Sequence, residues 1–257
     1  MNPFRSVTAK IILLVSVGTT LVLAIVLGYG YVNSRALILD RANYGARNLA
    51  DSVALQLELE IRSVAEITET FATYVENAPP DRNSLLLTLK RNLENQTEIY
   101  GSAVAFEPYA FDPEVRAFAP YYYGPKDALR YVQLGTESYN YFNRPWYANT
   151  ARSADPKRQW TEPYFDDGGG DIIMTTYTVP FFELGCDGAR NRFRGLVTAD
   201  VSVAWLTEKV SAVRVGKTGY AFLISQQGAF LAHPRKDLIM RRSIFDIAGE
   251  IGDSKLM

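Results

Sequence analysis

A run of 22 residues without a charged side chain, residues 11–32, constrains this chain more than any other feature. About 20 apolar residues in an α-helix rise roughly 30 Å, the thickness of the hydrocarbon core of a bilayer. Arg5 and Lys10 precede the run, and charges of both signs follow it. By the positive-inside rule the N-terminus stays in the cytoplasm, and residues after about 33 are extracytoplasmic. The sequence therefore predicts one helix that spans the cell inner membrane.

Two alternatives for this run are a cleaved signal peptide and a buried helix of a soluble domain. Signal peptides have a shorter apolar region and end at a small-x-small cleavage site. Residues 11–32 are longer than that, and no convincing Ala-x-Ala motif follows them. Helices of soluble proteins rarely run so long without a charge, so we expect an uncleaved membrane anchor.

Residues 34–77 contain no proline and a single glycine, Gly45, which predicts one long helix ended by Pro79 and Pro80. Its apolar side chains recur at steps of three and four residues, at Val53, Leu57, Ile61, Val64, Ile67, Phe71 and Tyr74. One interpretation is an amphipathic helix packed on its own domain. The other is a stalk that leaves the membrane and pairs with a second chain. Both can hold on different parts of the helix.

Beyond this helix the pattern changes to short elements. A helix is expected over residues 84–96, and from Tyr100 aromatic and β-branched residues gather in runs interrupted by proline and glycine, as in strands. Strands are expected over 101–107, 117–123, 172–182, 193–202 and 219–225, with helical pieces over 144–152 and 203–213. No glycine-rich nucleotide motif occurs, and helices do not alternate regularly with strands. The expected class is therefore α+β, with a long helix against an antiparallel sheet.

Charge balance and a shortage of reactive side chains exclude several functions. Lys and Arg total 27 against 28 Asp and Glu without a basic patch, so no nucleic-acid partner is expected. The single cysteine, Cys186, cannot form an internal disulfide or a multi-cysteine metal site. The G-x-S-x-G, P-loop and H-E-x-x-H motifs are missing, and His233 is the only histidine. We expect no cofactor, metal or catalytic residue here, with a membrane-anchored extracytoplasmic enzyme as the alternative.

The segment 166–171, Asp-Asp-Gly-Gly-Gly-Asp, is acidic and rich in glycine. It lacks the alternating acidic positions of a calcium-binding loop. We therefore predict a hairpin turn there rather than a cation site.

A chemically suggestive set of side chains combines Arg144 and Asp200 with tyrosines and tryptophans. A guanidinium group offers a planar fork of donors that fits a carboxylate. Aromatic faces attract an ammonium group by about 0.5–2 kcal/mol, and a carboxylate can pair with it. Such a set suits a small zwitterion held in an aromatic-walled cavity between Arg144 and Asp200. The alternative is that the Pro-Trp-Tyr run at 145–147 is core and that Arg144 forms a surface ion pair.

From about residue 34 to 243 the chain resembles the double Cache (dCache) family of extracytoplasmic sensors. The resemblance is carried by Arg-Pro-Trp-Tyr at 144–147, Trp-x-x-Pro-Tyr-x-Asp at 160–166, Thr-Tyr-Thr-Val-Pro at 176–180 and Gly-x-Val-x-x-Asp at 195–200. It implies PAS-like antiparallel modules. The expected organisation is a cytoplasmic N-terminus over 1–10, a transmembrane helix over 11–32, a long helix over 33–78, a membrane-distal module over 79–213 and an incomplete second PAS-like module over 214–257.

One subgroup of that family binds amino acids through a Tyr-x4-Arg-x-Trp-Tyr pattern, then Tyr-x-Asp, then a distant Asp. The matching residues here are Tyr139, Arg144, Trp146, Tyr147, Tyr164, Asp166 and Asp200. The resemblance implies that Arg144 and Trp146 hold the ligand carboxylate. It places Tyr164, Asp166 and Asp200 at the ammonium group.

The resemblance thus predicts the ligand-sensing region of a bacterial transmembrane receptor. Its expected partners are a small molecule (an amino acid or a related amine or carboxylate), the membrane, and a second copy through the long helix. Complete dCache domains return to the membrane and feed an output domain, so we expect this chain to be a fragment of a longer receptor. A ligand-free dimerising ectodomain is the remaining alternative.

Overall fold

A computed structural model describes residues 7–78, 81–185, 188–216 and 218–251. Its internal contacts divide the chain into two units, residues 1–52 and 53–257. Cys186 and the two prolines at 79 and 80 lie outside the described residues. The long helix α1 (Val7–Asn77) is continuous from the first unit into the second.

The first unit consists of the apolar part of α1. An 18-residue window of this helix has a mean hydropathy of 2.7, and none of it is buried against protein. Within the described ranges it is the one helix long and apolar enough to cross a membrane. Leu14, Ile25 and Leu27 are 76%, 62% and 64% exposed. So large an apolar surface is unfavourable in water and is typical of a helix that contacts lipid.

The second unit is built on one antiparallel sheet with the strand order β3-β2-β1-β7-β6-β4, and β5 also pairs with β6. The strands are β1 (Gly101–Phe106), β2 (Pro120–Tyr123), β3 (Arg130–Gln133), β4 (Gln159–Trp160), β5 (Tyr164–Phe165), β6 (Ile173–Leu184) and β7 (Arg190–Ser202). The long hairpin of β6 and β7 pairs from Met174–Ser202 to Leu184–Arg190. This architecture confirms the predicted α+β class.

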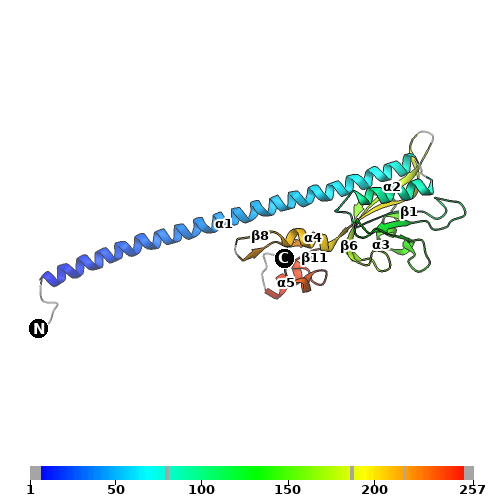
Figure 1. Ribbon diagram of the computed structural model, residues 1–257. Coiled ribbons are helices and arrows are strands. Elements are labelled where there is room, and N and C mark those ends of the chain that lie inside the picture. The colour runs from blue at the N-terminus through cyan, green and yellow to red at the C-terminus, as the bar shows by residue number, and fades with distance from the viewer. Residues whose placement is uncertain (1–6, 79–80, 186–187, 217, 252–257) are drawn as a thin grey trace. The chain divides into compact units, whose positions relative to one another are not determined.

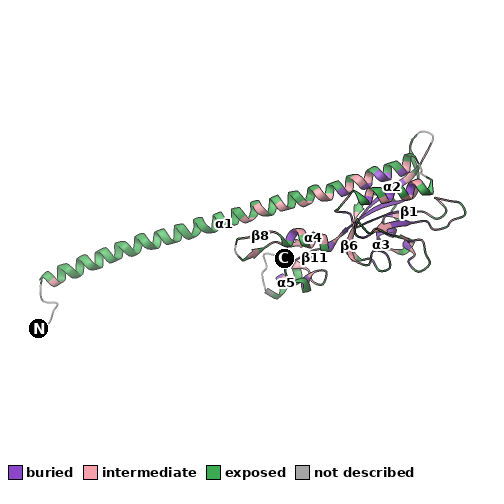
Figure 2. Ribbon diagram, viewed as in Figure 1, coloured by how far each residue is buried: buried purple, intermediate pink, exposed green. Residues whose placement is uncertain are grey.

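Two helices cover one face of this sheet, which we call the helix face (Figure 1). The C-terminal part of α1 and the helix α2 (Arg82–Glu94) pack Phe71, Val75, Leu85 and Leu89 against strand residues such as Val197. The buried residues of α1 are confined to positions 64–75, as the purple segments of Figure 2 show. The helix therefore packs on the sheet only through its distal part.

Asp81 fixes the start of α2. Its carboxylate accepts hydrogen bonds from the backbone N–H groups of Asn83 and Ser84. An N-cap of this kind satisfies donors that the helix itself leaves unpaired.

The segment that connects β3 to β6 covers the opposite face, which we call the loop face. It contains the short helices η2 (Tyr141–Asn143) and α3 (Pro145–Ala151). Its aromatic rings pack on small residues of β1, Ala103 and Ala105, and on Leu196 of β7. Because successive side chains of a strand point to opposite faces, β1 and β7 serve both layers at once.

A smaller set of elements follows β7. It comprises α4 (Val203–Ser211), β8 (Arg214–Val215), β9 (Gly219–Tyr220), β10 (Leu223–Ile224), β11 (Phe230–Ala232), η3 (Lys236–Leu238) and α5 (Ile244–Ile251). The single strand expected over 219–225 is two strands, because β9 pairs with β8 and β10 pairs with β11. The prediction of one continuous strand was therefore wrong. The predicted helical piece after Asp200 is α4, capped by Ser202.

Candidate functional site

Asp200 lies on the central strand of the sheet and points to the loop face. Its cross-strand neighbours are Gly101 on β1 and Thr176 on β6. It is only 4% exposed. The Thr176 hydroxyl donates a hydrogen bond of 2.7 Å to one of its carboxylate oxygens and lies 2.8 Å from the Tyr164 hydroxyl. The neighbouring strands therefore align Tyr164, Thr176 and Asp200 in one hydrogen-bonded row.

Asp166 reaches the same region from the turn between β5 and β6. Its carboxylate accepts a hydrogen bond of 2.5 Å from the Tyr139 hydroxyl and one of 2.8 Å from the backbone N–H of Gly170. A Cβ atom at Gly169 would lie 2.2 Å from this carboxylate, so the turn requires glycine there. The segment 166–171 is a hairpin turn, as predicted, and it carries Asp166 into the interior with 4% exposure.

Arg144 lies on the other side of Tyr139, immediately before α3. Its guanidinium carbon lies 4.2 Å from the centre of the Tyr139 ring. Its nitrogens donate to the backbone carbonyls of Tyr139 and Asp167. Trp146 donates from its indole nitrogen to the Tyr139 hydroxyl at 3.2 Å. Arg144 forms no ion pair within the described ranges, so the alternative of a surface ion pair does not describe it.

Tyr147 is the one predicted residue that the structure leaves outside this network. It is 2% exposed, and its hydroxyl donates to the Glu107 carboxylate at 2.5 Å. Its ring packs edge-on against Tyr141 and Trp146. Consecutive residues of a helix point about 100° apart, so Trp146 and Tyr147 cannot both face Tyr139.

Burial dominates the electrostatics of this group. Desolvation, reinforced by the charge of Asp166 and opposed by the hydrogen bond from Thr176, raises the pKa of Asp200 to about 7. Burial likewise raises the pKa of Tyr139 and Tyr164, so both hydroxyls stay protonated. In the part of the chain that the structure describes, no Lys or Arg forms an ion pair with Asp166 or Asp200. Among the described residues, hydrogen bonds and no ion pair therefore stabilise these two carboxylates.

The cavity expected between Arg144 and Asp200 stays a prediction. The ring of Tyr139 lies under Arg144 and its hydroxyl is bonded to Asp166, so this side chain lies between Arg144 and Asp166. Five grooves stand out on the described chain, and none is lined by a predicted site residue. The predicted residues are packed against one another in a closed arrangement.

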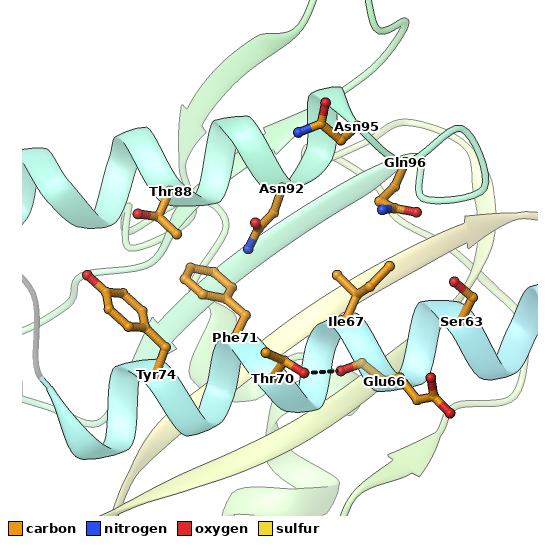
Figure 3. A pocket seen from close by; sticks show the side chains of 10 residues that line it. All are labelled: Ser63, Glu66, Ile67, Thr70, Phe71, Tyr74, Thr88, Asn92, Asn95 and Gln96. Atoms are coloured by element: carbon orange, nitrogen blue, oxygen red, sulfur yellow. Dashed lines mark hydrogen bonds between the residues drawn. The ribbon is translucent and has the colours of Figure 1, made fainter.

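Three of these grooves have volumes of about 860, 550 and 520 Å³. One of about 860 Å³ runs beside α4 and is lined by Ile173, Val203 and Ile239 among others. Another, of about 520 Å³, runs between α1 and α2 (Figure 3), where Ile67, Phe71 and Tyr74 face a row of Thr, Asn and Gln side chains. Neither contains a buried charge with which to hold a zwitterion.

Two residues of the network were not predicted from the sequence. Thr176 bonds Asp200. Burial raises the pKa of Tyr121 on β2, and the nearby charges of Asp200 and Asp166 raise it further. Strand alternation gives a usable signal for Thr176, because Tyr177 and Val179 belong to the helix face and Thr176 must then point the other way. His233, in contrast, accepts a hydrogen bond from the backbone of Arg235 and lies in the smaller set of elements.

In this chain a membrane-type helix is followed by an antiparallel sheet with a buried polar group on its loop face. Residues 85–208 match the family described as methyl-accepting chemotaxis protein-like, first PDC sensor domain. The chain therefore resembles the PDC, or double Cache, sensors of chemoreceptors and histidine kinases, in agreement with the sequence resemblance.

Known proteins support this assignment. The methyl-accepting chemotaxis protein McpC of Bacillus subtilis is 24% identical over 96% of this chain, which spans only 36% of McpC. The extracellular domain of mmHK1S-Z3 is 29% identical with a TM-score of 0.67, covering 80% of this chain and 78% of that one. The ligand-binding domain of the Pseudomonas fluorescens chemoreceptor CtaA, solved with L-serine, shares the fold at 20% identity and a TM-score of 0.54, covering 82% and 79%.

Proposed function

We propose that this chain binds a small molecule carrying an ammonium and a carboxylate group, an amino acid or a close relative, and signals its presence across the membrane. The observation that carries the proposal is the buried pair Asp166 and Asp200, which no described Lys or Arg neutralises. A buried carboxylate without a partner is unfavourable, and a ligand ammonium group supplies the missing charge. The L-serine complex of CtaA supports this ligand class for the fold.

In this proposal Arg144 and Trp146 receive the ligand carboxylate. The guanidinium group of Arg144 is half-buried and bonded only to backbone carbonyls, so its remaining donors are free for a charged acceptor. The ammonium group lies against Asp166, Asp200 and Tyr164. Tyr139 moves aside from between the two charged ends as the ligand enters, and its ring then forms a wall of the site.

The proposed path of the signal starts at Asp200 on β7. Helix α4 begins three residues later, at Val203. On α4, Lys209 donates a hydrogen bond of 2.8 Å to Glu60 of α1. Ligand binding at Asp200 shifts β7 and α4, and the ion pair passes the shift to the helix that continues into the membrane-type segment. A ligand biases such an equilibrium by its difference in affinity for the two states.

The proposed organisation keeps the expected boundaries. Residues 11–32 span the inner membrane, those after about 33 are extracytoplasmic, residues 79–213 form the distal module, and 214–257 begin a second module. Any catalytic output belongs to another part of a longer receptor. The relatives named above are receptors and sensors, which favours this function over that of an anchored enzyme.

We further propose a homodimer through the long helix. Leu55 and Leu59 of α1 are 57% and 59% exposed beyond the membrane-type segment. Their spacing places them on one stripe of α1 with Ile67 and Tyr74, which line the groove between α1 and α2 in Figure 3. A second copy anchored in the same membrane presents the same stripe in parallel.

Disulfide trapping of Leu59→Cys in a Cys186→Ser background tests this homodimer, with Arg192→Cys as the control.

Calorimetric titration of the whole chain in lipid nanodiscs with the twenty L-amino acids tests the ligand proposal. We expect saturable binding of at least one amino acid, lost in Arg144→Ala and in Asp200→Asn. The matched controls, Arg192→Ala and Asp155→Asn, alter exposed residues outside the site and bind as the wild type does. Binding that survives both site variants would contradict the proposal.

A further inference from the structure

The hydroxyl of Tyr121 is buried without a hydrogen-bond partner among the described residues. Tyr121 stands on β2 and is 2% exposed. It lies close enough to the Asp200 carboxylate for the two groups to interact, but no hydrogen bond of ordinary geometry joins them. Native structures keep few such unpaired groups, and those that persist call for an explanation.

Two glycines leave the space that this hydroxyl occupies. A Cβ atom at Gly101 would lie 2.2 Å from it, and one at Gly170 would lie 3.1 Å from it. Gly101 is the cross-strand partner of Asp200, and Gly170 donates its N–H to Asp166. The hydroxyl is therefore held between the strand neighbour of one buried carboxylate and the turn that carries the other.

We propose that the Tyr121 hydroxyl is the third acceptor for the ligand ammonium group, beside Asp166 and Asp200, while the Tyr164 hydroxyl stays bonded to Thr176, and that the site therefore selects primary over N-methylated amines. This inference rests on the proposed ligand class. A primary ammonium group has three N–H donors and no acceptor, so three acceptors satisfy it fully. A tyrosine hydroxyl can accept from the ammonium group while it donates to Asp200, which pairs the group that is now unpaired.

An N-methyl group would disturb this arrangement. It removes one N–H donor, which leaves one buried acceptor without a partner. Sites built to hydrogen-bond a group reject analogues that lack it far more strongly than they reject a change in apolar size.

The test compares Tyr121→Phe with the wild-type chain in nanodiscs. The probes are the tightest binder among the twenty L-amino acids and its N-methyl and N,N-dimethyl derivatives. Tyr131→Phe, which removes the hydroxyl of a 47% exposed tyrosine on β3, is the matched control. Thermal unfolding of each variant checks that it is folded, because the loss of an unpaired hydroxyl should leave stability unchanged or raised.

We expect the wild type to bind the primary amine at least about tenfold more tightly than its N-methyl form. In Tyr121→Phe, affinity for the primary amine should fall about tenfold while the N-methyl form is little affected, so discrimination shrinks. Equal binding of both probes by the wild type, or unchanged discrimination in a folded Tyr121→Phe, overturns the inference and leaves the amino-acid proposal standing. Absence of binding by all twenty amino acids overturns both.

Discussion

The two faces of the sheet differ in kind although the same strands build them. On the helix face, Val197 and Phe181 pack with α1 and α2 in a hydrophobic cluster. On the loop face, Thr176 and Asp200, from the same two strands, end in a buried network of hydroxyls and carboxylates. Successive residues of β6 and β7 therefore alternate between side chains that stabilise the fold on the helix face and side chains of the proposed ligand site on the loop face. The variants below test that separation.

The largest expected effect is on the helix face. Phe181→Ala removes a fully buried ring and should lower the free energy of unfolding by about 3–5 kcal/mol. Urea denaturation followed by circular dichroism measures this, and ligand affinity of the protein that remains folded should be unchanged. A loss below about 1 kcal/mol would show that this face does not carry the stability.

Asp200→Asn should have the opposite signature on the loop face. Ligand affinity should fall by about 100-fold, since the charge opposite the ammonium group is lost. Unfolding in urea should show equal or greater stability than the wild type, because an uncompensated buried carboxylate has been removed. Marked destabilisation with intact affinity would mean that Asp200 serves the fold rather than the ligand.

Stability of the ligand-free chain should depend on pH through the same residue. The pKa of Asp200 is raised from its ordinary 3.8 to about 7. Between these values the folded state holds a proton that the unfolded state releases, so stability falls as pH rises from about 4 to 7, by at most about 1.4 kcal/mol per pH unit. Urea titrations at several pH values should show this slope in the wild type and lack it in Asp200→Asn. An equal slope in both proteins would assign the effect to other groups.

The smallest expected effects distinguish two threonines of the loop face, one beside Asp200 and one farther along β6. Thr176→Val removes the donor to Asp200 and should weaken ligand binding several-fold. Thr178→Val, two residues along β6, removes a hydroxyl that contacts Thr150 and the Gln159 carbonyl. It should lower the free energy of unfolding by about 1 kcal/mol and leave affinity unchanged. Similar affinities for the two variants in calorimetry would contradict the placement of the site at the Asp200 end of the strands.

Much of the fold follows from sequence patterns. The unbroken helix before residue 78 and the long strands β6 and β7 have a periodicity that a single sequence displays. The strands β4, β5 and β8 have two residues each. So short a run has no measurable period, and its pairing partners decide whether it is a strand.

The site was predictable in its residue types but not in its geometry. Asp166 and Trp146 both bond the Tyr139 hydroxyl, and Asp200 lies within electrostatic reach of Asp166. Tyr147 follows Trp146 in sequence, yet the turn of α3 sends it to Glu107. Tyr121 and Thr176 were missed because only the register of β2, β1, β7 and β6 brings them to Asp200. That register depends on contacts between residues far apart in the chain.

A crystal structure of the chain with the tightest-binding amino acid tests the central claim most directly. The account predicts the ligand nitrogen within hydrogen-bonding distance of Asp166 and Asp200, the ligand carboxylate on Arg144, and Tyr139 displaced from between them. A ligand bound elsewhere, for instance in the groove between α1 and α2, with Asp200 still buried and unpaired, would contradict it.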